Sequence, residues 1–179
     1  MASPSSALVA MLSAASLGVL LAISPPARGA SVVSPSASGA AGRLSVSAYA
    51  RDVTTLLTRY DFAQGDGDRL LTERDADPRL VGDAGWRQSY ARVASEHQRE
   101  YAEIQTLAVP ANAQTVQDCV TDGLRLTATA DGMFLEAFTA EGHRAYYLSA
   151  HGNWDLNLGK TTIVRCRASF AAWQTKAGA

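Results

Sequence analysis

His97 is the residue of this chain best suited to acid–base chemistry. It recurs with Tyr90 and Tyr101 on the apolar face of a predicted helix, and an imidazole exchanges a proton near neutral pH. A packed, hydrogen-bonded histidine would follow the same pattern. Since spacing alone supplies no convincing partner for His97, we predict a packed side chain and no catalytic residue.

Asp118 is the one plausible acid to work with His97. It lies on a predicted strand, where alternation places it with Val116 and Val120 on the face opposite Cys119. An inward-facing carboxylate could be a general base. The other interpretation is a side chain that pairs with an arginine or faces water, and we expect this one.

Cys119 and Cys166 are the only two cysteines. An even number of cysteines in an exported chain indicates a disulfide, and two buried free thiols are the alternative. We predict the Cys119–Cys166 bridge, which chain-entropy arithmetic values at about 4 kcal/mol.

A cluster of acidic side chains near position 66 resembles a calcium loop only superficially. An EF-hand needs oxygen ligands at its first, third and fifth positions and glycine at the sixth, whereas a loop that starts at Asp66 has Leu70 and Leu71 there. His143 and His151 share no ligand spacing with His97. We predict no metal site and no cofactor. The acidic residues are assigned to turns and caps: Asp61, Asp66, Asp68 and Glu73.

The first 30 residues are typical of a secretory signal peptide. No charged side chain precedes Arg28, residues 7–23 are apolar, and Pro25-Pro26 follows. The 17-residue apolar run approaches the roughly 20 residues that span a bilayer, so an uncleaved anchor is the alternative. Residues 31–43 are rich in Ser, Ala and Gly and are predicted to be a disordered linker.

Two amphipathic helices are predicted in the first half of the folded region. Apolar residues recur every three or four positions over 44–60 and again over 83–101. Gly65 and Gly67 are expected to end the first helix, after which Asp68 caps a short one. Asp83 is expected to cap the other long helix.

The second half alternates strand-like runs with Xaa-Gly pairs, the glycines being Gly123, Gly132, Gly142 and Gly152. Such spacing predicts an antiparallel meander with tight turns. Residues 168–179 are expected to be a loose tail. The predicted fold class is therefore α+β, with the N-terminal helices packed on a curved antiparallel sheet.

Three short motifs carry a resemblance to a known family. They are the run Thr115-Val-Gln-Asp-Cys-Val-Thr-Asp122, the Gly152-Asn-Trp154 turn and the late Cys166. Over residues 44–167 the chain resembles the NTF2-like, cystatin-related cone, in its subgroup of secreted or lipid-anchored proteins of high-GC bacteria. The usual lipid-attachment cysteine is missing. The resemblance implies a cavity with these candidate residues: Tyr60, Trp86, Tyr90, His97 and Asp118.

The expected function is that of an exported, non-enzymatic accessory or binding protein of the bacterial cell envelope or extracellular space. Its partner would be an envelope protein or a small apolar ligand. A formal net charge of −1 argues against nucleic acid, and a membrane would be met only through an uncleaved N-terminal segment. The alternatives are a small isomerase or dehydratase that uses the cone cavity, and a secreted structural or inhibitory protein.

Overall fold

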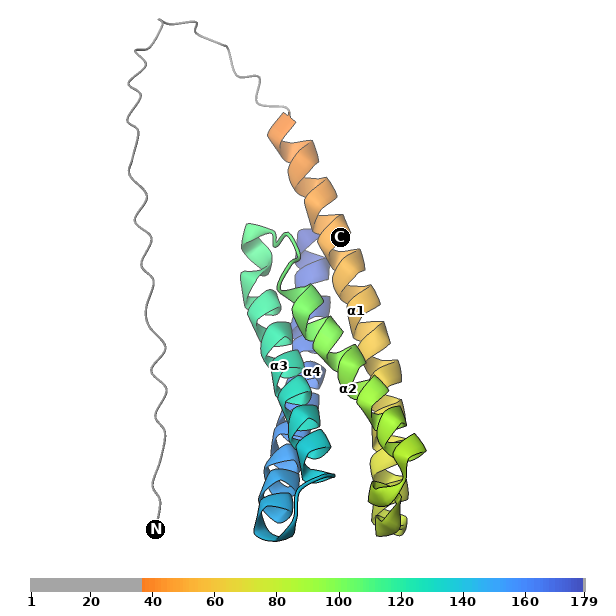
Figure 1. Cartoon of the computed structure of the whole chain (residues 1–179). Helices are drawn as coiled ribbons and strands as arrows, with labels where there is room; N and C mark the ends of the chain where they lie inside the picture. The colour runs from red at the N-terminus through yellow and green to blue at the C-terminus, as the bar shows by residue number, and fades with distance from the viewer. Residues whose placement is uncertain (1–36, 179) are drawn as a thin grey trace, which may run out of the picture. The chain divides into compact units, whose positions relative to one another are not determined.

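Residues 37–178 fold into four α-helices that run alternately up and down (Figure 1). This computed structural model describes residues 37–178, with side chains from residue 46 onward. The predicted signal peptide and the first part of the predicted linker lie outside the described residues. The helices are α1 (Ala37–Ala76), α2 (Ala84–Ile104), α3 (Gln114–Ala137) and α4 (Gly142–Ala177), and the 3-10 turns η1 (Pro78–Gly82) and η2 (Ala111–Ala113) flank α2.

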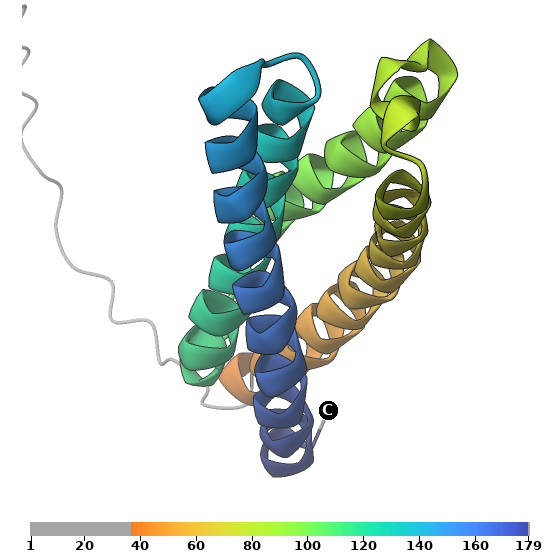
Figure 2. The same cartoon turned by 90° about the horizontal axis from the view of Figure 1, so that it is seen from below.

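The predicted α+β fold is wrong, because residues 37–178 contain no strand. The runs that were assigned to a meander form α3 and α4, which pack side by side (Figure 2). The resemblance to the NTF2-like cone is therefore also wrong. Of the supposed hairpin turns, only Glu141-Gly142 lies at a real chain reversal, where Gly142 has a φ of +56° at the start of α4.

Close helix packing explains Gly123, one of the predicted turn glycines, and also Gly159 of α4. A Cβ on Gly123 would lie 2.6 Å from Ile163 Cδ1, and one on Gly159 would lie 2.7 Å from Thr127 Oγ1. These two glycines therefore let the backbones of α3 and α4 approach each other. The regularly spaced glycines therefore do not mark hairpin turns. A close helix crossing also needs residues without a side chain, so the same glycine spacing suits either structure.

Two long helices run through positions where an end was predicted. α1 begins inside the predicted linker and continues through Gly65 and Gly67, so the expected break and short second helix are wrong. Gly67 is buried, and a Cβ there would lie 3.2 Å from Val93 Cγ1 of α2. Packing of Gly67 on α2 thus offsets the roughly 1 kcal/mol that a glycine costs in a helix, whereas Gly65 is exposed. α4 likewise covers most of the predicted tail.

The prediction of a capped helix after position 83 is confirmed. The Asp83 side chain accepts a hydrogen bond from the backbone N–H of Trp86 at 2.7 Å, which satisfies one of the free donors at the start of α2. Asp77 caps η1 in the same way, with Pro78 at the first position.

Two apolar clusters form the core. The first contains Tyr49, Leu56, Ile104, Val120 and Trp173, and the second contains Trp86, Tyr90, Phe134, Phe138 and Leu156. The predicted disulfide is confirmed: it joins Cys119 of α3 to Cys166 of α4 within the first cluster, with the Cα atoms 5.6 Å apart. Tyr60 of the first cluster and Tyr90 of the second each bond to buried polar side chains, and His97 lies against Tyr60; these are three of the predicted cavity residues.

Candidate functional site

The structure brings three of the five predicted cavity residues together. Tyr60 and His97 are buried with their ring centroids 5.4 Å apart, and Tyr90 is bonded to the same network. Trp86 is stacked on Tyr90 in the second apolar cluster. Asp118 is excluded from this group: it lies exposed on α3 and accepts a hydrogen bond from Gln114 Nε2 at 2.8 Å. The interpretation of Asp118 as an inward-facing base is therefore wrong.

The acid that meets His97 is Asp131, which the sequence interpretation assigned to an Asp-Gly turn. His97 Nδ1 lies 2.6 Å from Asp131 Oδ2, and the Tyr90 hydroxyl donates to Asp131 Oδ1 at 2.7 Å. An ionised carboxylate only accepts, so His97 Nδ1 is the donor in this contact. Burial and the nearby Asp131 charge raise the pKa of Tyr90 far above its usual value, which keeps it a donor.

The polar contacts extend from this pair toward the surface. The Tyr60 hydroxyl lies 3.3 Å from Thr127 Oγ1 and donates to Gln64 Oε1 at 3.2 Å. Gln64 Nε2 donates in turn to Asp68 Oδ1, which also accepts from Lys160 Nζ at 2.7 Å. Burial raises the pKa of Tyr60 to about 12. We call this group the polar layer: Tyr60, Gln64, Tyr90, His97, Thr127 and Asp131.

Glu100 is a fully buried acid beside the polar layer. Neither carboxylate oxygen has a hydrogen-bond partner among the described residues, and the same holds for His97 Nε2 and Arg59 Nε. Burial raises the pKa of Glu100 to about 7, although the charges of His97 and Arg59 oppose this shift.

The polar layer holds an acid, a base and a phenol, but a substrate must reach such groups to use them. His97, Asp131 and Tyr90 are each at most 2% exposed. The three surface clefts that follow are lined by other residues. The polar layer therefore serves to order α1, α2 and α3 rather than to form an accessible reaction centre.

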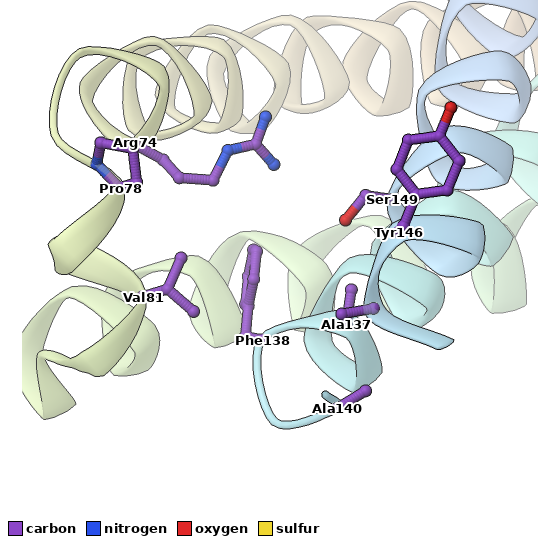
Figure 3. Close-up of a pocket in the computed structure, with 9 residues that line it drawn as sticks. Arg74, Pro78, Val81, Ala137, Phe138, Ala140, Tyr146 and Ser149 are labelled. Carbon is purple, nitrogen blue, oxygen red and sulfur yellow. The ribbon is translucent and has the colours of Figure 1, made fainter. Parts of the chain in front are cut away.

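A cleft of about 410 Å³ opens at the end of the molecule that contains η1 and the α3–α4 connection (Figure 3). Arg74 is the only charged residue that lines it, and its guanidinium carbon lies 5.6 Å from the centre of the Phe134 ring. We call it the Arg74 cleft. Its remaining lining is mostly apolar: Pro78, Val81, Ala137, Phe138, Ala140, Ala145, Tyr146 and Ser149.

The outer side of α4 carries exposed aromatic and aliphatic side chains. Trp154 is 72% exposed, Tyr147 51% and Leu158 45%. Hollows of about 270 and 320 Å³ lie on the two sides of Trp154. We call the stripe that shares this side of the helix the Trp154 face: Tyr147, His151, Trp154, Leu158, Thr161 and Arg165.

Other kinds of site find less support in the structure. In residues 37–178, no three His, Cys, Asp or Glu side chains lie close enough to hold a metal ion. Nor does any helix in this range have the length and apolar character needed to cross a bilayer.

No protein-family model matches the chain, and neither a curated protein nor a solved structure matches it.

Proposed function

We propose that the protein acts outside the cytoplasm as a non-enzymatic binding protein that takes a small apolar carboxylic acid in the Arg74 cleft. The observation that carries the proposal is a single arginine in an otherwise apolar cleft of about 410 Å³. That volume lies within the roughly 300–1,000 Å³ of small-molecule sites. An apolar ligand body would be desolvated by Val81 and Phe138, and its anionic head would pair with Arg74.

Export is supported by two features. The apolar run over residues 7–23 is followed by Pro25-Pro26, as in a secretory signal peptide. The Cys119–Cys166 disulfide also suits an oxidising compartment, because thiols in the cytosol are kept reduced. We therefore place the protein in the cell envelope or extracellular space.

The geometry of Arg74 suits a carboxylate. Asp75 accepts from its Nε and Nη2 at 2.9 and 2.6 Å, and Nη1 has no hydrogen-bond partner among the described residues. A guanidinium presents five donors, so the Nη1 hydrogens remain for a ligand. The Phe134 ring beneath the guanidinium holds it at the cleft. Figure 3 shows the Arg74 side chain extending along the cleft toward Ser149 and Tyr146.

A binding role suits the cleft better than catalysis. General acid–base catalysis needs a group whose pKa lies near the working pH. Arg74 and Tyr146 are the only titratable residues that line the cleft, and neither a histidine nor a carboxylate is among its lining residues. The groups better suited to such chemistry, His97 and Asp131, are buried in the polar layer.

Calorimetry with decanoate and decanol tests the proposal, because the two probes share an apolar chain and differ in charge. Decanoate should bind more tightly to the wild-type protein. Arg74→Gln should weaken decanoate binding about tenfold, the loss of one charge-assisted hydrogen bond, and leave decanol binding unchanged. Val81→Trp, which fills the cleft, should abolish the binding of both.

Arg79→Gln is the matched control, since Arg79 is an exposed arginine of η1 that does not line the cleft. It should bind decanoate like the wild type. If the wild type binds neither probe, or if Arg74→Gln and Arg79→Gln bind decanoate equally well, the proposed site is wrong.

A further inference from the structure

The Trp154 face is an apolar stripe without a cover among residues 37–178. Its residues 147, 154, 158 and 165 fall at steps of 7, 4 and 7, so they share one side of α4 over five turns. Single exposed apolar residues are ordinary on protein surfaces, but large exposed apolar side chains that gather on one side of a helix, as Tyr147, Trp154 and Leu158 do, mark an interaction site. Tyrosine and tryptophan are also the residues that most often anchor protein interfaces.

We propose that this face binds a second copy of the chain, with the two α4 helices antiparallel about a two-fold axis that lies between them, level with position 156. Trp154 and Leu158 lie two residues on either side of position 156, and Tyr147 and Arg165 lie nine residues on either side. An antiparallel two-fold pair therefore places Trp154 opposite Leu158 of the second copy. It likewise places Tyr147 opposite Arg165 of the second copy, and each contact is made twice.

The two contacts, Trp154 with Leu158 and Tyr147 with Arg165, each join side chains that suit one another. The hollows on the two sides of Trp154, lined by Ala150 and His151 on one side and by Leu158 and Thr161 on the other, can receive apolar side chains of the second copy. Arg165 is exposed and forms no ion pair with any described residue, so its guanidinium is free to lie on a tyrosine ring. The Tyr147 ring is already positioned by His151, with centroids 4.1 Å apart.

Electrostatic repulsion does not oppose this pairing. The two Arg165 side chains would lie at opposite ends of the contact, about 27 Å apart at 1.5 Å per residue. That separation exceeds the roughly 8 Å over which charges act at physiological salt. The contact is also short: one helix pair about 27 Å long buries less than the roughly 800 Å² per partner of a standard interface. The dimer is therefore weak and depends on concentration.

Sedimentation velocity and acrylamide quenching of tryptophan fluorescence test the dimer on the purified chain. Trp86 and Trp173 are buried, so Trp154 dominates the quenchable emission. Between about 1 and 300 µM, a range that suits a small interface, the wild type should shift from monomer to dimer and its quenching should fall. Leu158→Glu should stay monomeric with Trp154 fully quenchable. Arg165→Glu should weaken the dimer several-fold.

Phe62→Glu is the matched control, because Phe62 is as exposed as Trp154, at 74%, but lies on α1. It should dimerise like the wild type. A wild type that stays monomeric to 300 µM, or a Leu158→Glu variant that still dimerises, would overturn the proposal. So would a monomer whose Trp154 is shielded only by phosphatidylglycerol vesicles, because the face would then belong to a membrane surface.

Discussion

His97 Nδ1 lies 2.6 Å from Asp131 Oδ2 in the interior of the protein, and this contact joins α2 to α3. The other oxygen of the same carboxylate accepts from the Tyr90 hydroxyl. Asp131 therefore meets two donors from α2 and has little access to water. A buried carboxylate with this arrangement specifies how the two helices align, since any shift would leave an unpaired charge in the core.

Asp131→Asn should destabilise the protein by about 3 kcal/mol, because it leaves the partners of a buried pair incompletely satisfied. Urea unfolding followed by circular dichroism measures the difference. Asp122→Asn is the matched control on the same helix: Asp122 is exposed and pairs weakly with Arg125, so its replacement should change stability by less than about 0.5 kcal/mol. Equal effects of the two variants would contradict a structural role for the His97–Asp131 contact.

The buried Glu100 should make stability depend on pH in the direction opposite to that of most acids. Its pKa rises from 4.5 to about 7 on folding, so the native state holds a proton that the unfolded state has lost between these pH values. The free energy of unfolding therefore falls as pH rises from about 4.5 through 7. At 1.36 kcal/mol per pKa unit, the full loss above pH 8 is about 3 kcal/mol.

Glu100→Gln should remove this loss, since glutamine carries no charge to bury. The variant should be more stable than the wild type at pH 8 by up to about 3 kcal/mol and close to it at pH 4.5, as measured by urea unfolding at both pH values. Glu96→Gln is the control, because Glu96 lies on the same helix and pairs with Arg99 at the surface. A Glu100→Gln advantage that is the same at both pH values would show that Glu100 does not titrate as proposed.

The signal for Asp131 was present in the sequence. Val120, Leu124, Thr127, Asp131 and Phe134 recur every three or four positions, which is a helical stripe. The Asp131-Gly132 pair favours a hairpin turn instead, so the two local patterns conflict at this position. Tyr60, Tyr90 and His97 lie on apolar stripes whose helical period the sequence shows, although the predicted end of the first helix is wrong. The Arg74 cleft could not be predicted, because the ends of several elements enclose it.

The α2 region was predictable because its signals agree. The apolar period, the Asp83 cap and the polar opposite face all indicate one helix. In α3 and α4 the local signals conflict, since glycine and β-branched residues interrupt a helical period. Contacts between the two helices decide the outcome there. Those contacts follow from packing that a single sequence does not display, so the disulfide prediction rests on the even cysteine count and the export signal and not on the geometry of the two helices.

The disulfide should contribute about 4 kcal/mol, as expected from chain entropy for cysteines 47 residues apart. Cys119→Ala and Cys166→Ala should each lower the melting temperature by about 10 °C. The double variant should lose little more than either single one, because each removes the same bridge. Additive losses would show that the cysteines act through packing alone. Two reactive thiols in unreduced, denatured wild type would contradict the bridge itself.

Two Gly→Ala substitutions, one in α3 and one in α4, should change the stability of the protein in opposite directions. In an exposed helix, Gly→Ala stabilises by about 0.5–1 kcal/mol through the unfolded chain. Gly132 of α3 is exposed, and an added Cβ would meet nothing within 4 Å. Gly132→Ala should therefore raise the melting temperature.

Gly159→Ala should lower the melting temperature, although alanine forms helices more readily than glycine. Its Cβ would lie 2.7 Å from Thr127 Oγ1 and 3.0 Å from the Gly123 backbone oxygen, and the backbone cannot move aside as a flexible side chain would. Forcing α3 and α4 apart costs about 1–3 kcal/mol, which exceeds the propensity gain. Thermal unfolding of both variants measures the contrast. If Gly159→Ala stabilised the protein as much as Gly132→Ala, the close approach of α3 and α4 at this crossing would be disproved.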